Sequence, residues 1–375
     1  MSSYSHFTQE ETERYSRHFS LPGFGEEAQA NLKNSSVIVI GAGGLGCPLL
    51  QYLAAAGVGT IAIADHDRVS LSNLQRQVLF NSDEIGLYKS EVALSKLQRL
   101  NANTFFSTII RKINSQNALE LLAPYDLIID CTDNFPTRYL LNDASVLLNK
   151  PLIYGSIFRY EGQVAVFNYQ GGVTYRDLYP QPPAPGVVPS CEEGGVLGVL
   201  AGIIGCMQAN EAIKILSGFA PPLSGKLLLF DSLSNETTII SIASKNERKK
   251  ISELIDYDDF CNVQSNQANY MKEVTVQELK ELKDTGANFQ LIDVREPHEV
   301  DICEIGGELI PQGDIPHNVD KISRDKQVII HCRSGARSGN MVKWLETNHG
   351  FTNLYNLKGG ILAWAKEIDT NMPTY

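Results

Sequence analysis

We expect the 375-residue chain to lack a segment that directs export or spans a membrane. Its first residues, Met1 to His18, are polar and charged and have no apolar core like that of a signal peptide. The longest uncharged stretch, Gly194 to Asn210, contains five glycines together with Gln and Asn, which favours a buried helix over a membrane span. We therefore expect a soluble cytoplasmic protein without a membrane partner.

An excess of basic residues is also missing. The net charge of −11 argues against a nucleic-acid partner bound through phosphate contacts. The seven cysteines are unevenly spaced in a chain without a secretion signal, which indicates reduced thiols rather than disulfides. No low-complexity tract or clear repeat is present, and a chain of this length is expected to form two domains.

Apolar runs alternate with helical patterns in the first 245 residues. Val37 to Ile40 is typical of a buried parallel strand that ends at a glycine turn. Later strands are expected to be antiparallel, so the pattern predicts a Rossmann-like doubly wound α/β sheet with an antiparallel extension. The expected helices are 8–18, 47–56 and 89–100, and the other expected strands are 60–64, 127–130, 152–154, 163–169 and 226–230.

A polar, charged and aperiodic stretch at 246–272 indicates a linker. Beyond it, a helix at 275–283 and strands at 290–293 and 327–331 predict a second, smaller α/β domain over 273–375. We therefore divide the chain into domains at 1–245 and 273–375.

The segment Gly41-Ala-Gly-Gly-Leu-Gly46 lies between an expected strand and an expected helix, where glycines let the backbone approach phosphates. Asp65 closes the next strand, where a carboxylate would hold ribose hydroxyls. These features alone favour a dinucleotide-dependent dehydrogenase, with a purely structural turn as the alternative. The polar run from Asp65 to Gln77, followed by Lys89 and Asp130-Cys-Thr-Asp-Asn134, instead suits a triphosphate with Mg²⁺.

On these motifs the chain resembles the MoeB/ThiF family of ubiquitin-activating-like adenylyltransferases. The resemblance covers about residues 8–243, and it includes Ser72-Asn-Leu-Gln-Arg76-Gln77, Arg14-Tyr-Ser-Arg17 and Pro189-Ser-Cys191. It implies an activating-enzyme fold, a homodimer, and ATP with Mg²⁺ as cofactors. The implied reaction is attack of the C-terminal Gly-Gly carboxylate of a ubiquitin-like sulfur carrier protein on the α-phosphate of ATP, which gives an acyl-adenylate and pyrophosphate.

The resemblance also implies individual roles. Arg76 and Lys89 would contact the phosphates, Asn73 would help to position them, and Asp133 would hold Mg²⁺. Arg17 would reach into the site from the partner subunit. The alternative for each of these residues is a purely structural role in a surface ion pair or a helix cap. The implied nucleotide-binding residues are Gly41, Gly43, Gly44, Gly46, Asp65, Asp67, Ser72, Asn73, Leu74, Gln75, Arg76, Lys89, Asp133 and Asn134.

Cys191 follows a proline-rich loop that prolines would keep extended. The family resemblance links it to sulfur transfer or to a covalent bond with the carrier; an inert buried thiol is the alternative. Many relatives bind structural zinc through two Cys-x-x-Cys pairs, but here Thr174 and Asp177 occupy the first pair and Cys261 stands alone, so we expect no zinc site. We interpret Cys47, Cys131, Cys206 and Cys303 as packing residues.

In the second domain, Cys332-Arg-Ser-Gly-Ala-Arg337 follows a strand and precedes a helix, so backbone N–H groups and Arg337 should stabilise a thiolate at Cys332. The Cys-x4-Arg spacing resembles the active loop of rhodanese sulfurtransferases, as do the segments 293–299 and 357–364. A cysteine phosphatase, which uses a longer loop, and a degenerate regulatory domain, which would normally lack the cysteine, are the alternatives.

Together the two domains suggest that the carrier is adenylated and then converted to a thiocarboxylate by a persulfide on Cys332. A persulfide donor such as a cysteine desulfurase would load Cys332. Among the pathways that use Gly-Gly sulfur carriers, molybdopterin synthesis is favoured over thiamine thiazole synthesis and tRNA thiolation. A nucleotide-dependent oxidoreductase and a non-catalytic carrier-binding scaffold are the competing classes.

Overall fold

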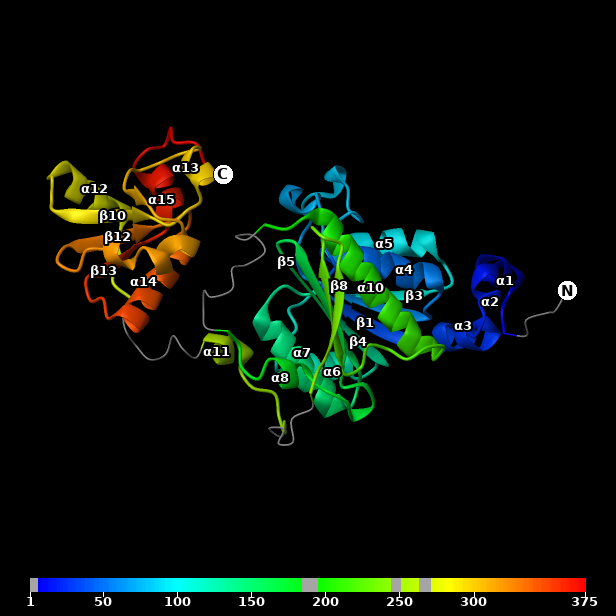
Figure 1. Ribbon diagram of the computed structural model, residues 1–375. Helices are drawn as coiled ribbons and strands as arrows, with labels where there is room; N and C mark the ends of the chain where they lie inside the picture. Colours follow the sequence, from blue (N-terminus) through cyan, green and yellow to red (C-terminus); the bar gives the residue numbers. More distant parts are fainter. Residues whose placement is uncertain (1–5, 184–194, 244–250, 263–270) are drawn as a thin grey trace. The chain divides into compact units, whose positions relative to one another are not determined.

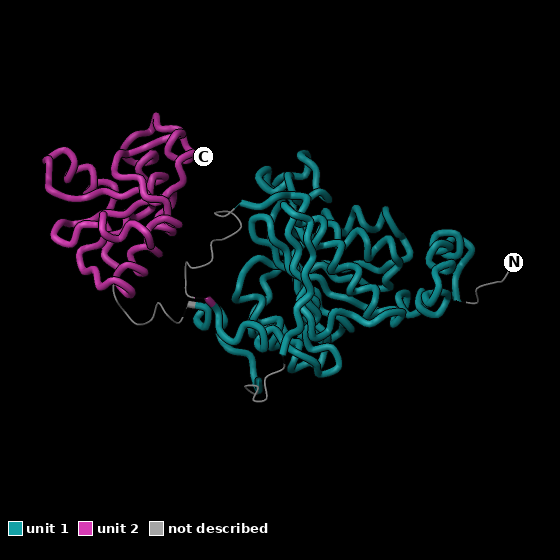
Figure 2. Tube along the Cα trace, viewed as in Figure 1, with its two compact units in different colours: residues 1–182, 189–261 teal, residues 183–188, 262–375 magenta. Residues whose placement is uncertain are grey.

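The computed structural model describes residues 6–183, 195–243, 251–262 and 271–375. The chain forms two compact units (Figure 2). Unit 1 comprises residues 1–182 and 189–261, and unit 2 comprises residues 183–188 and 262–375. Cys191 lies outside the described residues.

Unit 1 is built on one eight-stranded sheet in the order β3-β2-β1-β4-β5-β6-β7-β8 (Figure 1). From β3 to β5 neighbouring strands are parallel, and from β5 to β8 they are antiparallel. The predicted doubly wound sheet with an antiparallel extension is therefore confirmed. The strands are β1 (Ser36–Ile40), β2 (Thr60–Ala64), β3 (Phe105–Ile109), β4 (Leu127–Asp130), β5 (Leu152–Phe158), β6 (Glu161–Phe167), β7 (Lys226–Asp231) and β8 (Thr237–Ser241).

The centre of this sheet is buried on both faces, as the alternating side chains of β1 show. Val37 and Val39 of β1 belong to one hydrophobic core, and Ile38 and Ile40 belong to the other. The described α-helices of unit 1 are α1 (Gln9–Arg14), α2 (Ser16–Phe19), α3 (Gly25–Asn34), α4 (Gly46–Ala56), α5 (Lys89–Leu100), α6 (Ala118–Leu122), α7 (Phe135–Leu148), α8 (Tyr175–Leu178), α10 (Gly198–Ser217) and α11 (Tyr257–Asn262).

Helix α10 is long and apolar enough to cross a membrane by length and composition alone. It packs instead against α3 and α4 and against strands β5 and β6. Leu200 and Ile204 of this helix are fully buried in the core shared with α4. This is the packing of a core helix, as the sequence analysis expects.

The segment assigned to the linker contains a helix that belongs to unit 1. Tyr257 of α11 is buried in the core beside α7, and its hydroxyl donates a 2.7 Å hydrogen bond to Asp143 Oδ2. Asp256, Asp258 and Asp259 surround the two aromatic residues of this helix, Tyr257 and Phe260, and this polar sequence concealed the helix. Part of the range 246–272 is therefore folded onto the first unit.

Unit 2 contains a five-stranded parallel sheet in the order β11-β10-β12-β13-β9. This confirms the expected smaller α/β domain. Its strands are β9 (Glu273–Val274), β10 (Phe289–Asp293), β11 (Glu308–Leu309), β12 (Gln327–His331) and β13 (Leu354–Leu357), and its α-helices are α12 (Val276–Asp284), α13 (Pro297–Val300), α14 (Ala336–His349) and α15 (Gly360–Glu367).

Candidate functional site

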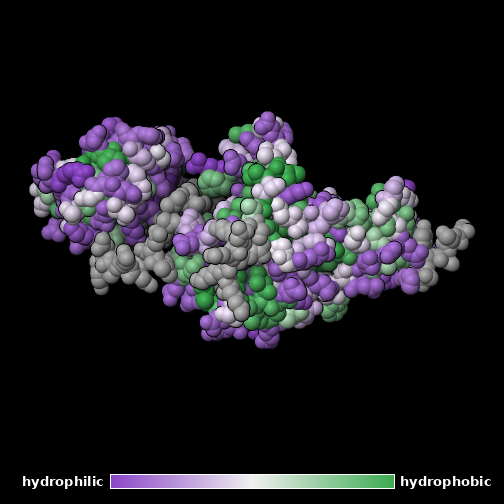
Figure 3. All heavy atoms as spheres, turned by 60° about the horizontal axis from the view of Figure 1, so that its bottom comes forward, coloured by the Kyte–Doolittle hydropathy of each residue, from purple (hydrophilic) through white to green (hydrophobic). Residues whose placement is uncertain are grey.

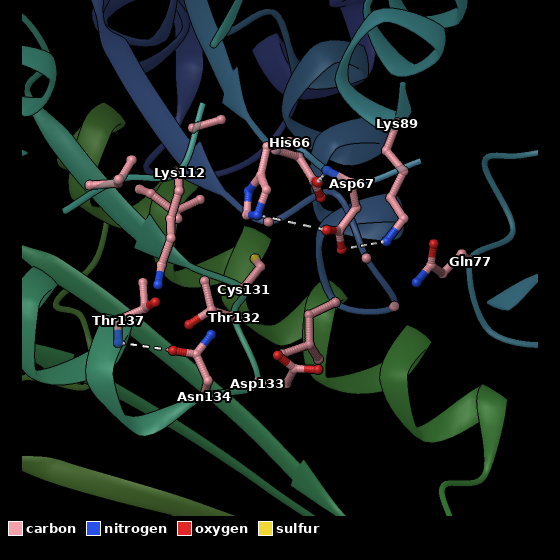
Figure 4. A pocket seen from close by; sticks show the side chains of 18 of the residues that line it. His66, Asp67, Gln77, Lys89, Lys112, Cys131, Thr132, Asp133, Asn134 and Thr137 are labelled. Carbon is pink, nitrogen blue, oxygen red and sulfur yellow. Dashed lines mark hydrogen bonds and ion pairs between the residues drawn. The ribbon is translucent and has the colours of Figure 1, made fainter. Parts of the chain in front are cut away.

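A pocket in unit 1 lies where the parallel strands β1, β2 and β4 reach their carboxyl ends (Figure 4). This is the edge at which doubly wound sheets bind ligands. Nine residues that the sequence analysis assigned to nucleotide binding line it: Gly41, Gly43, Gly44, Asp65, Asp67, Arg76, Lys89, Asp133 and Asn134.

The glycines of the turn after β1 serve two different purposes. Gly41 has a φ of +96°, and a Cβ there would lie 2.8 Å from the carbonyl oxygen of Cys131. A Cβ on Gly46 would lie 2.1 Å from the carbonyl oxygen of Gly41, so both positions require glycine for the turn itself. At Gly43 the nearest atom, Gln77 Nε2, would be 3.5 Å from an added Cβ, which is ordinary contact. Gly43 therefore leaves its backbone open to the pocket without being required by a protein neighbour.

Asp65 ties the glycine turn to the segment that follows β2. Its Oδ2 accepts a 2.7 Å hydrogen bond from the backbone N–H of Ala42, and its Oδ1 accepts one of 2.8 Å from the N–H of Asp67. Burial raises the pKa of this carboxyl, against the neighbouring charge of Lys89. Each carboxylate oxygen has a second lone pair, so the group can still accept a hydrogen bond from a ligand hydroxyl.

Lys89 brings a buried positive charge to the pocket. The residue is 5% exposed, and its ammonium lies 3.1 Å from Asp67 Oδ2, while the other oxygen of this carboxylate, Oδ1, lies 3.9 Å from His66 Nε2 (Figure 4). The Asp67 side chain is 59% exposed. An exposed carboxylate can exchange its partner with little loss, so Lys89 is available to a more negative ligand.

Asp133 and Asn134 face Lys89 across the pocket, from the segment that follows β4 (Figure 4). Both residues are exposed. Asn134 caps α7, since its Oδ1 accepts a 3.0 Å hydrogen bond from the N–H of Thr137. Asp133 directly precedes this cap, which puts a carboxylate at the pocket.

Two buried polar atoms in the pocket have no hydrogen-bond partner in the described part of the chain: Gln77 Oε1 and Arg138 Nε. Gln77 belongs to the motif at 72–77, where the sequence indicated no role for it, and Arg138 was not predicted. Arg138 lies one helical turn after Asn134, a spacing that could have drawn attention to it. Unpaired buried polar atoms are rare in native proteins, and a polar ligand would satisfy them. Cys131, which we interpret from the sequence as a packing residue, also lines the pocket, and the lining residues without an assigned role include His66, Arg111, Lys112, Thr132 and Thr137.

Several assigned residues do not line this pocket. Gly46 is buried in the turn, and Ser72 to Gln75 form the short 3₁₀-helix η1 (Leu71–Asn73) and the turn after it. This turn leads into Arg76, which does line the pocket and whose Nη1 donates a 3.1 Å hydrogen bond to the carbonyl of Ser72. Arg17 is exposed on α2.

The positions that would hold the first zinc-binding pair form a helix cap. Asp177 Oδ2 accepts hydrogen bonds from the N–H and the hydroxyl of Thr174, at 2.7 and 3.0 Å, at the start of α8. Cys261 is half-buried, and burial raises its pKa to about 11. Within residues 6–183, 195–243, 251–262 and 271–375, no three His, Cys, Asp or Glu side chains are grouped to hold a metal ion.

In unit 2, Cys332 lies in the loop between β12 and α14 and is 1% exposed. Its Sγ accepts a 3.2 Å hydrogen bond from the N–H of Gly335, and the Ser338 hydroxyl lies 3.4 Å away. The carbonyl of Cys332 accepts a 2.9 Å hydrogen bond from Ile361 at the start of α15, and a Cβ on Gly360 would lie 2.4 Å from that carbonyl oxygen. The glycines of the 357–364 motif therefore let α15 support the loop.

Arg337 lies in the first turn of α14, directly after this loop, and is held by Glu299 of α13. Both guanidinium contacts to the carboxylate oxygens measure 2.6 Å. Burial acts to raise the pKa of Glu299, but the Arg337 hydrogen bonds outweigh it and lower the pKa to about 2. The charge of Arg337, which the sequence analysis assigned to the thiolate, is thus shared with a carboxylate that the sequence analysis gave no role.

Comparison with known proteins shows the family of each unit. Residues 15–251 match the ThiF family, and residues 275–367 match the rhodanese-like domain. The chain is 44% identical to a probable adenylyltransferase/sulfurtransferase MoeZ of Mycobacterium tuberculosis, covering 99% of this chain and 97% of that protein. It is 40% identical to the adenylyltransferase and sulfurtransferase MOCS3 of Drosophila yakuba, covering 98% and 86% of the two chains. The crystal structure of E. coli MccB with ATP matches 66% of this chain and 75% of its own, with a TM-score of 0.56 and 22% identity, which shows a shared fold.

Proposed function

The chain belongs to the ThiF family and is an adenylyltransferase with a rhodanese-like sulfurtransferase domain, and from this premise we propose that it converts a protein carrier to a thiocarboxylate. The proposed substrate is the C-terminal Gly-Gly carboxylate of a ubiquitin-like sulfur carrier that serves molybdopterin synthesis. ATP activates this carboxylate, and Cys332 supplies the sulfur after loading by a persulfide donor such as a cysteine desulfurase. We expect the enzyme to work in the cytosol.

One observation carries the adenylation half of the proposal. Arg76, Lys89 and Asp133 come from three separate segments and line the same pocket as the glycine turn. Attack of a carboxylate on the α-phosphate brings two anions together, so fixed positive charge is needed between them. In the proposed mechanism Arg76 and Lys89 supply this charge, Asn73 positions the turn that carries Arg76, and Asp65 binds the ribose.

The pocket residues also fit a magnesium ion. Mg²⁺ is usually held by one or two carboxylates together with substrate phosphates, so it does not need a complete protein cage. Asp133 is exposed at the pocket and could supply such a carboxylate. When bound there, the ion would offset the negative charge of the triphosphate.

The sulfur half of the proposal runs through Cys332. The terminal sulfur of its persulfide attacks the acyl carbon, the bond to AMP breaks, and an acyl disulfide forms. A second thiol then attacks Cys332 Sγ, releasing the carrier thiocarboxylate and leaving a disulfide. We propose Cys191 for this thiol, from its place in the family motif.

We further propose that the enzyme works as a homodimer. On the face that Figure 3 displays, unit 1 exposes several hydrophobic areas, whereas unit 2 is mostly hydrophilic. An open groove along α10 contains Val78 and Val199, which are 66% and 62% exposed, and Arg76 lies in both the groove and the pocket. A second copy seated on this groove would approach the nucleotide pocket, as delivery of Arg17 requires.

The test of adenylation is pyrophosphate exchange into ATP, measured with each Gly-Gly carrier of the same cell. We expect exchange with the molybdopterin carrier and its loss in the Asp133→Ala variant. Exchange with only a different carrier would assign the enzyme to that carrier's pathway. The absence of exchange with every carrier would contradict the adenylation proposal.

Mixed subunits test the dimer. Arg17→Ala and Lys89→Ala chains, each inactive alone, should regain activity when mixed, since one site of a mixed dimer would have both residues intact. If mixing restores nothing although the mixed dimer forms, Arg17 does not act across the interface.

A further inference from the structure

Tyr375 joins two charged side chains beside the loop of Cys332. Its hydroxyl oxygen lies 2.9 Å from Arg295 Nη1 and 2.9 Å from Glu299 Oε1. An arginine N–H can only donate, so the hydroxyl accepts from Arg295 and donates its own proton to Glu299. Glu299 also accepts both hydrogen bonds from Arg337, so a chain of hydrogen bonds connects Arg295 to Arg337, with the Glu299 carboxylate accepting from both sides.

The far end of this chain is rigid. Arg295 is fully buried and binds Asp293 through contacts of 2.7 to 3.0 Å, and its Nη2 also donates a 2.9 Å hydrogen bond to the carbonyl of Cys303. Burial raises the pKa of Tyr375 to about 12, so its hydroxyl keeps its proton at neutral pH. The hydroxyl is therefore a fixed donor to Glu299.

The ring of Tyr375 makes a second, separate contact with the loop. The guanidinium carbon of Arg333 lies 5.2 Å from the ring centroid, within the range of a cation–π interaction. Arg333 directly follows Cys332 and is exposed. Tyr375 thus acts on both ends of the loop: through Glu299 on Arg337, and directly on Arg333.

We propose that Tyr375 is a positioning residue for sulfur transfer at Cys332. Its hydroxyl orients the carboxylate that holds Arg337, and its ring holds Arg333 where an anionic sulfur donor arrives. Tyr375 touches no reacting atom. The inference concerns the sulfurtransferase domain alone, so it does not depend on which carrier the enzyme activates.

The test uses the intact chain with thiosulfate as donor and cyanide as acceptor. The Cys332 thiolate attacks the sulfane sulfur of thiosulfate, the S–S bond breaks and sulfite leaves; cyanide then takes the terminal sulfur as thiocyanate and the thiolate returns. Rates are divided by the fraction of Cys332 that forms a persulfide, measured by mass spectrometry. This division removes any effect of partial unfolding.

Two substitutions separate the two contacts. Tyr375→Phe keeps the ring and should lower kcat roughly tenfold, the effect of about one charge-assisted hydrogen bond, with the KM for thiosulfate within about twofold. Tyr375→Leu should lower kcat similarly and also raise the KM severalfold, because Arg333 loses the ring. Tyr355→Phe is the matched control: Tyr355 is half-buried on β13, its ring contacts Lys272, and neither parameter should change.

A double variant tests the route through Glu299. Because the hydroxyl acts through this carboxylate, Glu299→Gln with Tyr375→Phe should be no slower than Glu299→Gln alone. Losses that multiply in the double variant would overturn the proposal. So would a Tyr375→Phe variant with the kcat of the unmodified chain.

Discussion

The proposed nucleotide pocket of unit 1 and the segment from Cys332 to Arg337 of unit 2 (the sulfur loop) both contain charged residues, but they arrange these residues differently. In the pocket, Lys89 is buried against an exposed carboxylate, and Asp133 is exposed. Around the loop, Arg337 and Glu299 are both mostly buried and joined by two short contacts. A pocket that must take up a charged nucleotide keeps exchangeable partners, whereas a loop that works through one sulfur atom keeps its charges satisfied within the protein.

Substitution of Cys332 should abolish sulfur transfer without changing adenylation, so the two activities should respond independently. Cys332→Ser should reduce sulfur transfer by on the order of a thousandfold or more, as loss of a nucleophile does, and leave pyrophosphate exchange unchanged. Cys261→Ser, at a half-buried thiol of unit 1, is the control and should keep both activities. If the Cys332→Ser variant still makes thiocarboxylate at the normal rate from a persulfide donor, the assignment of Cys332 fails.

The difference in charge burial should appear in stability. Glu299→Ala leaves Arg337 unpaired in a mostly buried site and should cost about 3–5 kcal/mol of unfolding free energy. Asp67→Ala removes the exposed partner of Lys89, which keeps the carboxylate of Asp65 as a neighbouring negative charge, and should cost about 1 kcal/mol or less.

Both tryptophans, Trp344 and Trp364, lie in unit 2, so fluorescence of the intact chain in urea follows the unfolding of that unit. Calorimetry would give the transition of unit 1. If the two substitutions lower the unfolding free energy by equal amounts, the proposed difference in charge burial between the sites is wrong.

The same pair should make unit 2 sensitive to acid. The pKa of Glu299 is lowered to about 2, so its contribution to stability is present above its ordinary value of 4.5 and is lost as the pH falls toward 2. The full contribution is about 3 kcal/mol. The stability difference between the unmodified chain and Glu299→Gln, measured by tryptophan fluorescence, should therefore shrink by about this amount between pH 5 and pH 2. A difference that stays constant over this range would show that the ionised carboxylate is not what stabilises the pair.

Local backbone constraints explain which parts of the molecule were predictable from the sequence. Gly41 and Gly46 are demanded by contacts within one turn, and β1 is a short apolar run between recognisable signals, so both were visible in the sequence. Strand β8 was missed because all five of its residues are exposed, and β3 because only Phe106 of its five residues is buried. Their pairing partners, not their own composition, make them strands.

Prediction from local sequence has the same limit at the sulfur loop, where some contacts depend on residues far along the chain. Cys332 and Arg337 lie five positions apart and were found from their spacing. The partner of Arg337, Glu299, precedes it by 38 positions, and Tyr375, which donates to Glu299, lies 76 positions from that carboxylate. Nothing in the sequence around either residue indicates that contact, because it is created by the packing of the domain.

The substitution with the smallest expected effect tests whether the backbone of Gly43 must stay accessible to the nucleotide. Gly43→Ala adds a methyl group at ordinary contact distance from Gln77, so the unfolding free energy should change by about 1 kcal/mol or less. The methyl group would project where a phosphate must approach the backbone, so the KM for ATP should rise about tenfold. Gly41→Ala is the counterpart, since its φ and its contact with Cys131 make it destabilising whether or not ATP binds. A Gly43→Ala variant that loses stability but keeps the ATP affinity of the unmodified chain would show that this glycine serves the turn and not the nucleotide.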